Sequence, residues 1–246
     1  MDQTALLEMV GIEKGYGRVR AVTGIDMVVG HDEVIGLVGD NGAGKSTLIK
    51  VLSGVYPPDA GKIFWEGKEV HLGSPRDAMQ LGIETIYQEP ALIEKVSIMR
   101  NIFMGREKTI PVGPLNWLRV GEMARESVKA LDGVGLELRS PQAIVEQLSG
   151  GQRQGVAIAR AMYFKTKLMI LDEPTNNLSV KESQKILKFV QDLKAQGIAS
   201  IFITHNLQHV YPVADRIIVL SHGAKIGDFR RQDTSVDELT SLIVQG

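Results

Sequence analysis

The sequence contains no cysteine, few aromatic residues and no strong excess of either charge. Without cysteine the chain can form neither a disulfide bond nor a zinc site with thiolate ligands, which is consistent with a reducing cytoplasm. A formal net charge of -1 gives no general attraction to nucleic acid or to anionic lipid. We therefore do not expect nucleic acid as a partner.

Long apolar runs are also missing. Nowhere do eighteen apolar residues follow one another without a charge, and the first residues lack the basic-then-apolar layout of a signal peptide. We expect a chain without a membrane-spanning helix, so that contact with a membrane would pass through a partner. The 246 residues, 43% of them apolar, could form one large α/β domain or two smaller ones.

The order of the apolar segments predicts an α/β fold. Early β-rich segments with glycine punctuation predict an antiparallel sheet layer; they cover residues 6–19, 25–39 and 61–73. Compact apolar runs predict buried parallel strands; they cover residues 34–39, 83–88, 168–173, 198–205 and 216–221.

Helices with recognisable ends lie between several of these strands. One helix is expected after Ser74, with Pro75 in its first position and Gly82 past its end. Another begins with a capping box formed by Ser179 and Glu182. Strand, helix and strand in this order predict a parallel sheet with crossover helices.

The stretch 89–165 breaks this alternation, and its pattern predicts a mostly helical insertion. We therefore expect a single domain over 1–246. Residues 1–88 and 166–246 would form its core with the β subdomain, and residues 89–165 its helical subdomain.

The segment GDNGAGKST at 39–47 matches the phosphate-loop pattern, with an apolar strand before it and a helical pattern after it. Its glycines allow backbone N–H groups to surround a β-phosphate. Lys45 can bridge the β and γ oxygens, and the Ser46 hydroxyl can bind Mg²⁺. We expect contacts with a nucleoside triphosphate from the whole loop: Gly39, Asp40, Asn41, Gly42, Ala43, Gly44, Lys45, Ser46 and Thr47.

Polar residues lie at the carboxyl ends of three predicted strands. Asp172 could hold Mg²⁺, usually through water, while Glu173 could polarise a water that attacks the γ-phosphate. Gln88 could touch the metal or that water, and His205 could reach the γ-phosphate, because α/β sheets bind ligands at the carboxyl ends of their strands. Considered singly, each of these residues could also simply end a strand in solvent.

A second candidate anion site lies in the segment LSGGQ, formed by Ser149, Gly150, Gly151 and Gln152 before a helical pattern. A helix N-terminus stabilises an anion by roughly 0.3–1 kcal/mol, and up to ~2 in a sheltered site. Even millimolar nucleotide binding requires about 4 kcal/mol, and this loop has no lysine. It can therefore only close over a phosphate held by other groups, in the same chain or in another copy.

These motifs, in this order and over nearly the whole chain, resemble the nucleotide-binding subunit of ABC transporters. The resemblance implies a P-loop NTPase fold, with a RecA-like parallel sheet core, an antiparallel β subdomain and a helical ABC-specific insertion. It implies ATP and Mg²⁺ as cofactors, with Ser46, Gln88 and Asp172 as metal ligands. Glu173, His205 and Gln88 would be the catalytic residues.

The resemblance further implies that Tyr16 stacks on adenine. It also implies that, on ATP binding, the LSGGQ residues contact the nucleotide of the opposite subunit in a head-to-tail homodimer or pair of like domains. One segment departs from the family pattern. Where many members have Ser-Ala-Leu-Asp after LDEPT, this chain has Asn176, Asn177, Leu178 and Ser179. Serine caps a helix about as well as Asp does, but an acid that would help communication between two sites is missing.

Within the family, the amino-acid sequence of segments such as GIETIYQEPALIEKVSIMRNIFMGRE is similar to that of ATPases for monosaccharide import, of the ribose, xylose or fructose type. This similarity implies separate membrane permease subunits, indirectly a substrate-binding protein, and a peripheral location at the cytoplasmic face of the cell membrane. The alternatives are a lipid or drug exporter subunit, or a non-transport ABC ATPase acting on DNA or ribosomes. The latter usually needs coiled-coil insertions, zinc-binding cysteines or basic tracts, which this sequence lacks.

Overall fold

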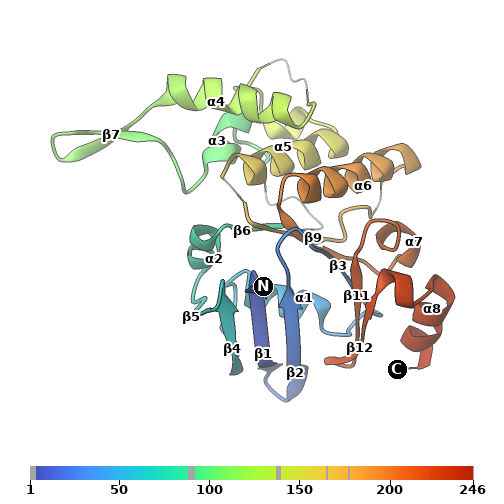
Figure 1. Cartoon of the computed structure of the whole chain (residues 1–246). Helices are drawn as coiled ribbons and strands as arrows, with labels where there is room; N and C mark the ends of the chain where they lie inside the picture. Colours follow the sequence, from blue (N-terminus) through green and yellow to red (C-terminus); the bar gives the residue numbers. More distant parts are fainter. Residues whose placement is uncertain (1–3, 88–91, 137–139, 165, 177, 246) are drawn as a thin grey trace. The chain divides into compact units, whose positions relative to one another are not determined.

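The computed structural model describes residues 4–87, 92–136, 140–164, 166–176 and 178–245. The chain divides into two compact units, a larger one formed by Met1–Gln88 with Lys167–Gly246 and a smaller one formed by Glu89–Thr166. Figure 1 shows the helices and strands of both units.

A six-stranded sheet with the order β12-β11-β3-β10-β9-β6 forms the centre of the larger unit. Its strands are β3 (Val34–Val38), β6 (Ile83–Ile86), β9 (Leu168–Asp172), β10 (Ala199–Ile203), β11 (Arg216–Ser221) and β12 (Ala224–Arg230). All neighbours pair in parallel except β12, which pairs antiparallel with β11 at the edge. Every residue of β3 and β10 is buried, as expected for strands covered on both faces. The parallel strands predicted from the sequence are therefore confirmed.

The second sheet of this unit is antiparallel, with the order β2-β1-β4-β5. It contains β1 (Leu7–Tyr16), β2 (Val19–Val29), β4 (Ala60–Trp65) and β5 (Lys68–Val70). The predicted segment 25–39 is divided between the two sheets, because its first part ends β2 and its last part forms β3. Tyr16 thus stands at the end of β1, where the chain turns into β2.

The helices of the larger unit are α1 (Lys45–Leu52), α2 (Pro75–Leu81), α6 (Val180–Ala195), α7 (Leu207–Val210) and α8 (Val236–Gln245). The predicted ends of two of them are confirmed. Ser74 is the N-cap of α2 and Gly82, in the left-handed conformation, is its C-cap. Ser179 and Glu182 form the capping box of α6.

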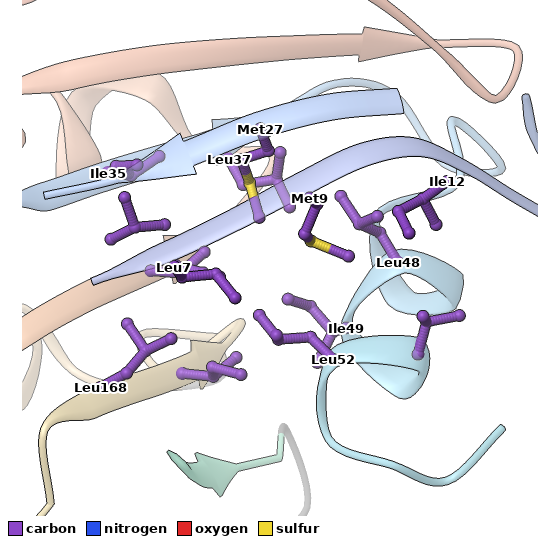
Figure 2. Packing of buried hydrophobic residues seen from close by; sticks show 14 of the residues in the cluster. Leu7, Met9, Ile12, Met27, Ile35, Leu37, Leu48, Ile49, Leu52 and Leu168 are labelled. Atoms are coloured by element: carbon purple, nitrogen blue, oxygen red, sulfur yellow. The ribbon is translucent and has the colours of Figure 1, made fainter. Parts of the chain in front are cut away.

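The main core packs α1 between the two sheets, as Figure 2 shows. Leu48, Ile49 and Leu52 of α1 are fully buried together with Leu7 of β1 and Leu37 of β3. Because this core holds α1, it also holds the loop that leads into the first residue of α1.

The smaller unit contains α3 (Ile98–Phe103), β7 (Thr109–Val112), β8 (Leu115–Leu118), α4 (Val120–Gly133) and α5 (Gly150–Tyr163). Its core is formed by apolar residues of the three helices, among them Ile102, Met123 and Val156. The expectation of a mostly helical segment omitted the antiparallel hairpin β7–β8. Proline at position 111 and Gly113, at φ +61°, interrupt any helix there, and a glycine at positive φ suits a two-residue hairpin loop.

Candidate functional site

A cavity of about 510 Å³ opens in the larger unit at the carboxyl ends of β3, β9 and β10. This is the edge at which parallel α/β sheets bind ligands. The cavity is lined by Tyr16, Ala21, Asn41, Gly42, Ala43, Gly44, Lys45, Ser46, Thr47, Asp172, Glu173, Asn176 and His205. It therefore brings together the greater part of the predicted phosphate loop and the predicted side chains at two of the three strand ends.

The loop between β3 and α1 needs glycine at specific positions. Gly39 has φ +147° and Gly44 has φ +100°. A Cβ atom on Gly44 would lie 2.5 Å from the carbonyl oxygen of Ala21, and one on Gly39 would collide with that of Leu220. Since α1 begins at Lys45, its first N–H groups have no partner within the helix and follow directly on this close-packed turn. Such a turn at a helix N-terminus is suited to binding phosphate.

Lys45 is the cation of this loop. Its side chain is almost fully buried, and Nζ donates hydrogen bonds to the carbonyl oxygens of Gly39, at 2.8 Å, and Asp40, at 2.9 Å. Burial lowers the pKa of Lys45, while the charges of Glu173, Asp172 and Asp40 act in the opposite direction. The ammonium group is thus held against the loop and faces a set of acidic groups.

Asp172 ends β9 and lies partly buried at the cavity wall. Burial and the neighbouring charge of Glu173 raise its pKa, and Lys45 and Lys50 offset this only in part. A carboxylate whose charge is disfavoured in this way would be stabilised by a bound cation.

The donor set around Asp172 fits Mg²⁺. The Ser46 hydroxyl and the Asp172 carboxylate line the same cavity, and Mg²⁺ prefers oxygen ligands. In the described part of the chain, no group of three or more His, Asp or Glu residues could hold a metal ion alone. At a usual Mg²⁺ site, one or two protein oxygens are completed by water and substrate phosphates. Gln88, the third predicted metal ligand, lies outside the described residues.

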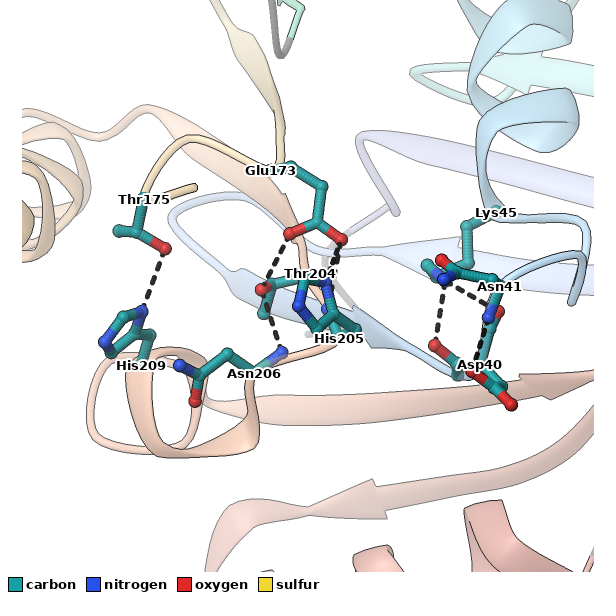
Figure 3. A network of polar contacts seen from close by, with 10 residues as sticks. Asp40, Asn41, Lys45, Glu173, Thr175, Thr204, His205, Asn206 and His209 are labelled. Atoms are coloured by element: carbon teal, nitrogen blue, oxygen red, sulfur yellow. Dashed lines mark hydrogen bonds and ion pairs between the residues drawn. The ribbon is translucent and has the colours of Figure 1, made fainter. Parts of the chain in front are cut away.

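Glu173 has a left-handed backbone conformation, with φ +47°, which is uncommon for a residue with a side chain. Its N–H donates to the carbonyl oxygen of Ile203, at 3.0 Å. Oε1 accepts from the His205 backbone N–H, at 3.1 Å, and His205 Nδ1 lies 2.8 Å from the same oxygen. Oε2 accepts from the Thr204 hydroxyl, at 3.0 Å. Figure 3 shows these contacts between the residues that follow β9 and β10.

Tyr16 lines the cavity and is 41% exposed, so that its ring is accessible to a flat ligand. Tyr56 packs edge-on against it, with the ring centroids 5.6 Å apart. Asp59 holds the end of β1 by accepting hydrogen bonds from Gly15 N, at 2.8 Å, and Lys14 Nζ, at 2.6 Å. The hydrogen bond from Lys14 lowers the pKa of Asp59.

The LSGGQ residues belong to the smaller unit, whereas all cavity residues belong to the larger one. Ser149 is the N-cap of α5, and it forms a capping box with Gln152. Ser149 Oγ accepts from Gln152 N, at 3.2 Å, and Gln152 Oε1 accepts from Ser149 N, at 3.0 Å. The predicted helix N-terminus is therefore present, and both side chains are used to hold it.

Sequence reasoning did not identify Thr204, Tyr56 or Asp59, all of which contact residues of the site. Thr204 offered one signal, because it directly precedes His205 at the end of an apolar strand. Asn176 was noted only as a departure from a family pattern, yet it lines the cavity. Asn177 lies outside the described residues.

Comparison with known proteins gives consistent results. A family model described as ABC transporter matches residues 22–176. The chain is 46% identical to the xylose/arabinose import ATP-binding protein of Sulfolobus acidocaldarius, over 97% of this chain and 93% of that protein. It is 40% identical to the fructose import ATP-binding protein of Rhizobium meliloti, over 99% and 95% respectively.

Two further comparisons concern length and fold. A ribose import ATP-binding protein of Geobacillus kaustophilus is 38% identical over 97% of this chain, but the match spans only 48% of that protein. Among solved structures, a nucleotide-free ATP-binding cassette from an ABC transporter superposes with a TM-score of 0.82 and 27% identity. That match covers 98% of this chain and 95% of the solved one.

Proposed function

The chain belongs to the ABC transporter family, and from this premise we propose that it is the ATP-hydrolysing subunit that powers import of a monosaccharide. The family assignment and the P-loop NTPase fold agree with the resemblance seen in the sequence. The names of the relatives, all of them import ATP-binding proteins, favour import over a lipid or drug exporter and over an ATPase that acts on DNA or ribosomes.

One observation carries the enzymatic part of this proposal. The cation and the hydroxyl of the phosphate loop, Lys45 and Ser46, line the same cavity as the acids Asp172 and Glu173 and the imidazole of His205. Phosphoryl transfer requires this combination, since catalysis rests on positioning and on stabilising charge at the transferred phosphate. A plain nucleotide-binding fold would not need a carboxylate held by three hydrogen-bond contacts at that place.

Each residue of the site has its own role in ATP hydrolysis. The loop backbone and Lys45 hold the β- and γ-phosphates of ATP. When bound by Ser46 and Asp172, Mg²⁺ would neutralise part of the charge on the phosphate oxygens. Glu173 accepts a proton from the water that attacks the γ-phosphate, and His205 holds the carboxylate and contacts the γ-phosphate. On the sequence pattern, Gln88 contributes a further contact to the metal or the water.

The chain also has a helix N-terminus that can complete a second copy's site. Ser149, Gly150, Gly151 and Gln152 would contact the nucleotide bound by the opposite subunit in a head-to-tail dimer. A helix N-terminus contributes roughly 0.3–1 kcal/mol and cannot hold a nucleotide alone, so this one would act on a nucleotide that another copy already binds. ATP binding would then draw two copies together, and hydrolysis would release them.

Coupling to transport requires partners. Among the helices that the structure describes, none combines the length and the apolar composition needed to span a membrane. We propose that the subunit docks on separate membrane permease subunits at the cytoplasmic face, and that a sugar-binding protein acts through them. Tyr16 would stack on the adenine of the bound ATP.

Reconstitution with its permease tests this function. We expect the chain to co-purify with multispanning membrane subunits and its ATP turnover to rise when a monosaccharide and the matching binding protein are added. A chain that hydrolyses ATP but binds no permease, and responds to no sugar, would contradict the import function.

A further inference from the structure

Three groups hold the carboxylate of Glu173: the backbone N–H and the imidazole of His205 at Oε1, and the hydroxyl of Thr204 at Oε2. His205 contacts Oε1 with a side chain that is 56% exposed. Thr204 donates to Oε2 from a position that is 1% exposed. An exposed imidazole can rotate away when a ligand arrives, whereas a buried threonine has little room to change its rotamer.

The direction of the Thr204 hydrogen bond is fixed by its neighbours. Its Oγ1 accepts a hydrogen bond from Asn206 N, at 3.0 Å. A hydroxyl has one proton, and an ionised carboxylate can only accept. The proton of Thr204 is therefore directed to Glu173 Oε2, with Asn206 behind it (Figure 3).

Hydrogen bonds also hold the backbone at Thr204 and the side chain of Asn206. Thr204 N donates to the carbonyl oxygen of Leu37, at 3.3 Å, which ties the end of β10 to β3. Asn206 Oδ1 accepts from Gln208 N, at 3.0 Å, and so caps α7. Glu173, in contrast, has the left-handed conformation and leaves its strand in a sharp turn. The Glu173 side chain therefore needs hydrogen bonds from other residues to hold its carboxylate in one orientation.

We propose that Thr204 is the positioning residue for Glu173: its hydroxyl fixes Oε2 and thereby directs the carboxylate toward the water that attacks ATP. This inference rests on the proposed function, because it assigns Thr204 a role only if Glu173 receives the proton of that water. Thr204 itself does not line the cavity and acts only through Glu173.

The test compares variants that differ in the hydroxyl. Thr204→Val removes the hydroxyl but keeps the shape of the side chain. Thr204→Ser and Thr204→Ala differ from each other only in the hydroxyl, so their comparison isolates its effect. Ser200→Ala is the matched control. Ser200 lies on β10, the strand that Thr204 follows, and is fully buried, and its hydroxyl has no hydrogen-bond partner among the residues that the structure describes.

Steady-state ATP hydrolysis by the full chain with Mg²⁺ is measured for each variant. Displacement of a catalytic group by about 1 Å can lower the rate roughly 100-fold, so we expect the Val and Ala variants to lose roughly 10- to 100-fold in kcat. Their KM for ATP should change by less than about threefold, since the phosphate loop is intact. The Ser variant should keep most of its kcat, and Ser200→Ala should behave as the unmodified chain.

Several outcomes would overturn the inference. These are an unchanged kcat in Thr204→Val and Thr204→Ala, a Ser variant as slow as the Ala variant, or a loss that falls on KM alone. The proposed function is tested separately by Glu173→Gln. If Glu173→Gln stops turnover while Thr204→Val does not slow it, the inference fails and the function stands. If Glu173→Gln turns over normally, the function itself fails.

Discussion

His205 Nδ1 lies 2.8 Å from Glu173 Oε1, although the two residues are 32 positions apart in the sequence. The contact exists because Glu173 follows β9 and His205 comes after β10, and these strands are neighbours in the parallel sheet. It places an imidazole and a carboxylate at the wall of one cavity, next to the loop that carries Lys45.

Glu173→Gln should bind ATP but hydrolyse it far more slowly, because an amide cannot accept the proton of the attacking water. General-base catalysis contributes roughly 10²- to 10⁴-fold, and the loss should fall in that range. With ATP present the variant should also accumulate as a dimer, which size-exclusion chromatography would detect. Normal turnover would remove Glu173 from its role.

Lys45→Ala should lose ATP binding, because it removes the only lysine or arginine among the residues that line the described cavity. Fluorescent-nucleotide titration measures the change in Kd. Lys181→Ala is a suitable control, since Lys181 is exposed on α6 and is not part of the cavity lining. Equal affinity for ATP in both variants would argue against the phosphate loop as the binding site.

Tyr16→Ala should raise the KM for ATP and leave kcat nearly unchanged. Stacking of a base on an aromatic ring contributes about 1–3 kcal/mol, so an increase of roughly tenfold is expected. Tyr16→Phe should restore the KM, because it keeps the ring that packs against Tyr56. A KM that is the same in all three proteins would exclude adenine stacking by this residue.

Asp172→Asn should stabilise the chain without ligand while weakening Mg²⁺-dependent hydrolysis. The pKa of Asp172 is raised in the folded state by burial and by Glu173, so the ionised carboxylate costs stability at neutral pH. This cost falls as the pH drops through the raised pKa toward about 3.9, the value for an unfolded chain. Urea denaturation should therefore show the variant more stable at pH 7 and closer to the parent at lower pH. A less stable variant at pH 7 would contradict this reasoning.

Gly39→Ala should lower the free energy of unfolding by about 1–3 kcal/mol, the usual cost of a strained backbone position. The added Cβ would also meet the Leu220 carbonyl oxygen. Gly133→Ala offers the opposite case, because Gly133 ends α4, is exposed and has no atom within 4 Å of an added Cβ. That change should raise stability by roughly 0.5–1 kcal/mol. Chemical denaturation of both variants measures the contrast.

The parts of the site that lie within one continuous motif could be predicted from the sequence. The phosphate loop and the pair Asp172 and Glu173 are of this kind, because a buried strand and the residues that follow it are adjacent in the chain. The contacts of Thr204 with Glu173 and of Tyr56 with Tyr16 join segments far apart in the sequence, and only the fold brings them together.

The hairpin β7–β8 was missed for another reason. All its residues are exposed, so the alternation of buried and exposed positions that reveals a strand is absent. Ile110 faces Trp117 across the two strands, and only this pairing, which sequence periodicity does not contain, defines the hairpin.

Mixing two inactive variants tests the division of one ATP site between two copies most directly. A Lys45→Ala chain keeps its LSGGQ loop, and a Gly151→Asp chain keeps its phosphate loop; each should be inactive alone. When the two are mixed, heterodimers contain one intact composite site, so ATP hydrolysis should return to a fraction of the unmodified rate. No recovery on mixing, or full hydrolysis by a monomer whose LSGGQ segment is scrambled, would contradict the account.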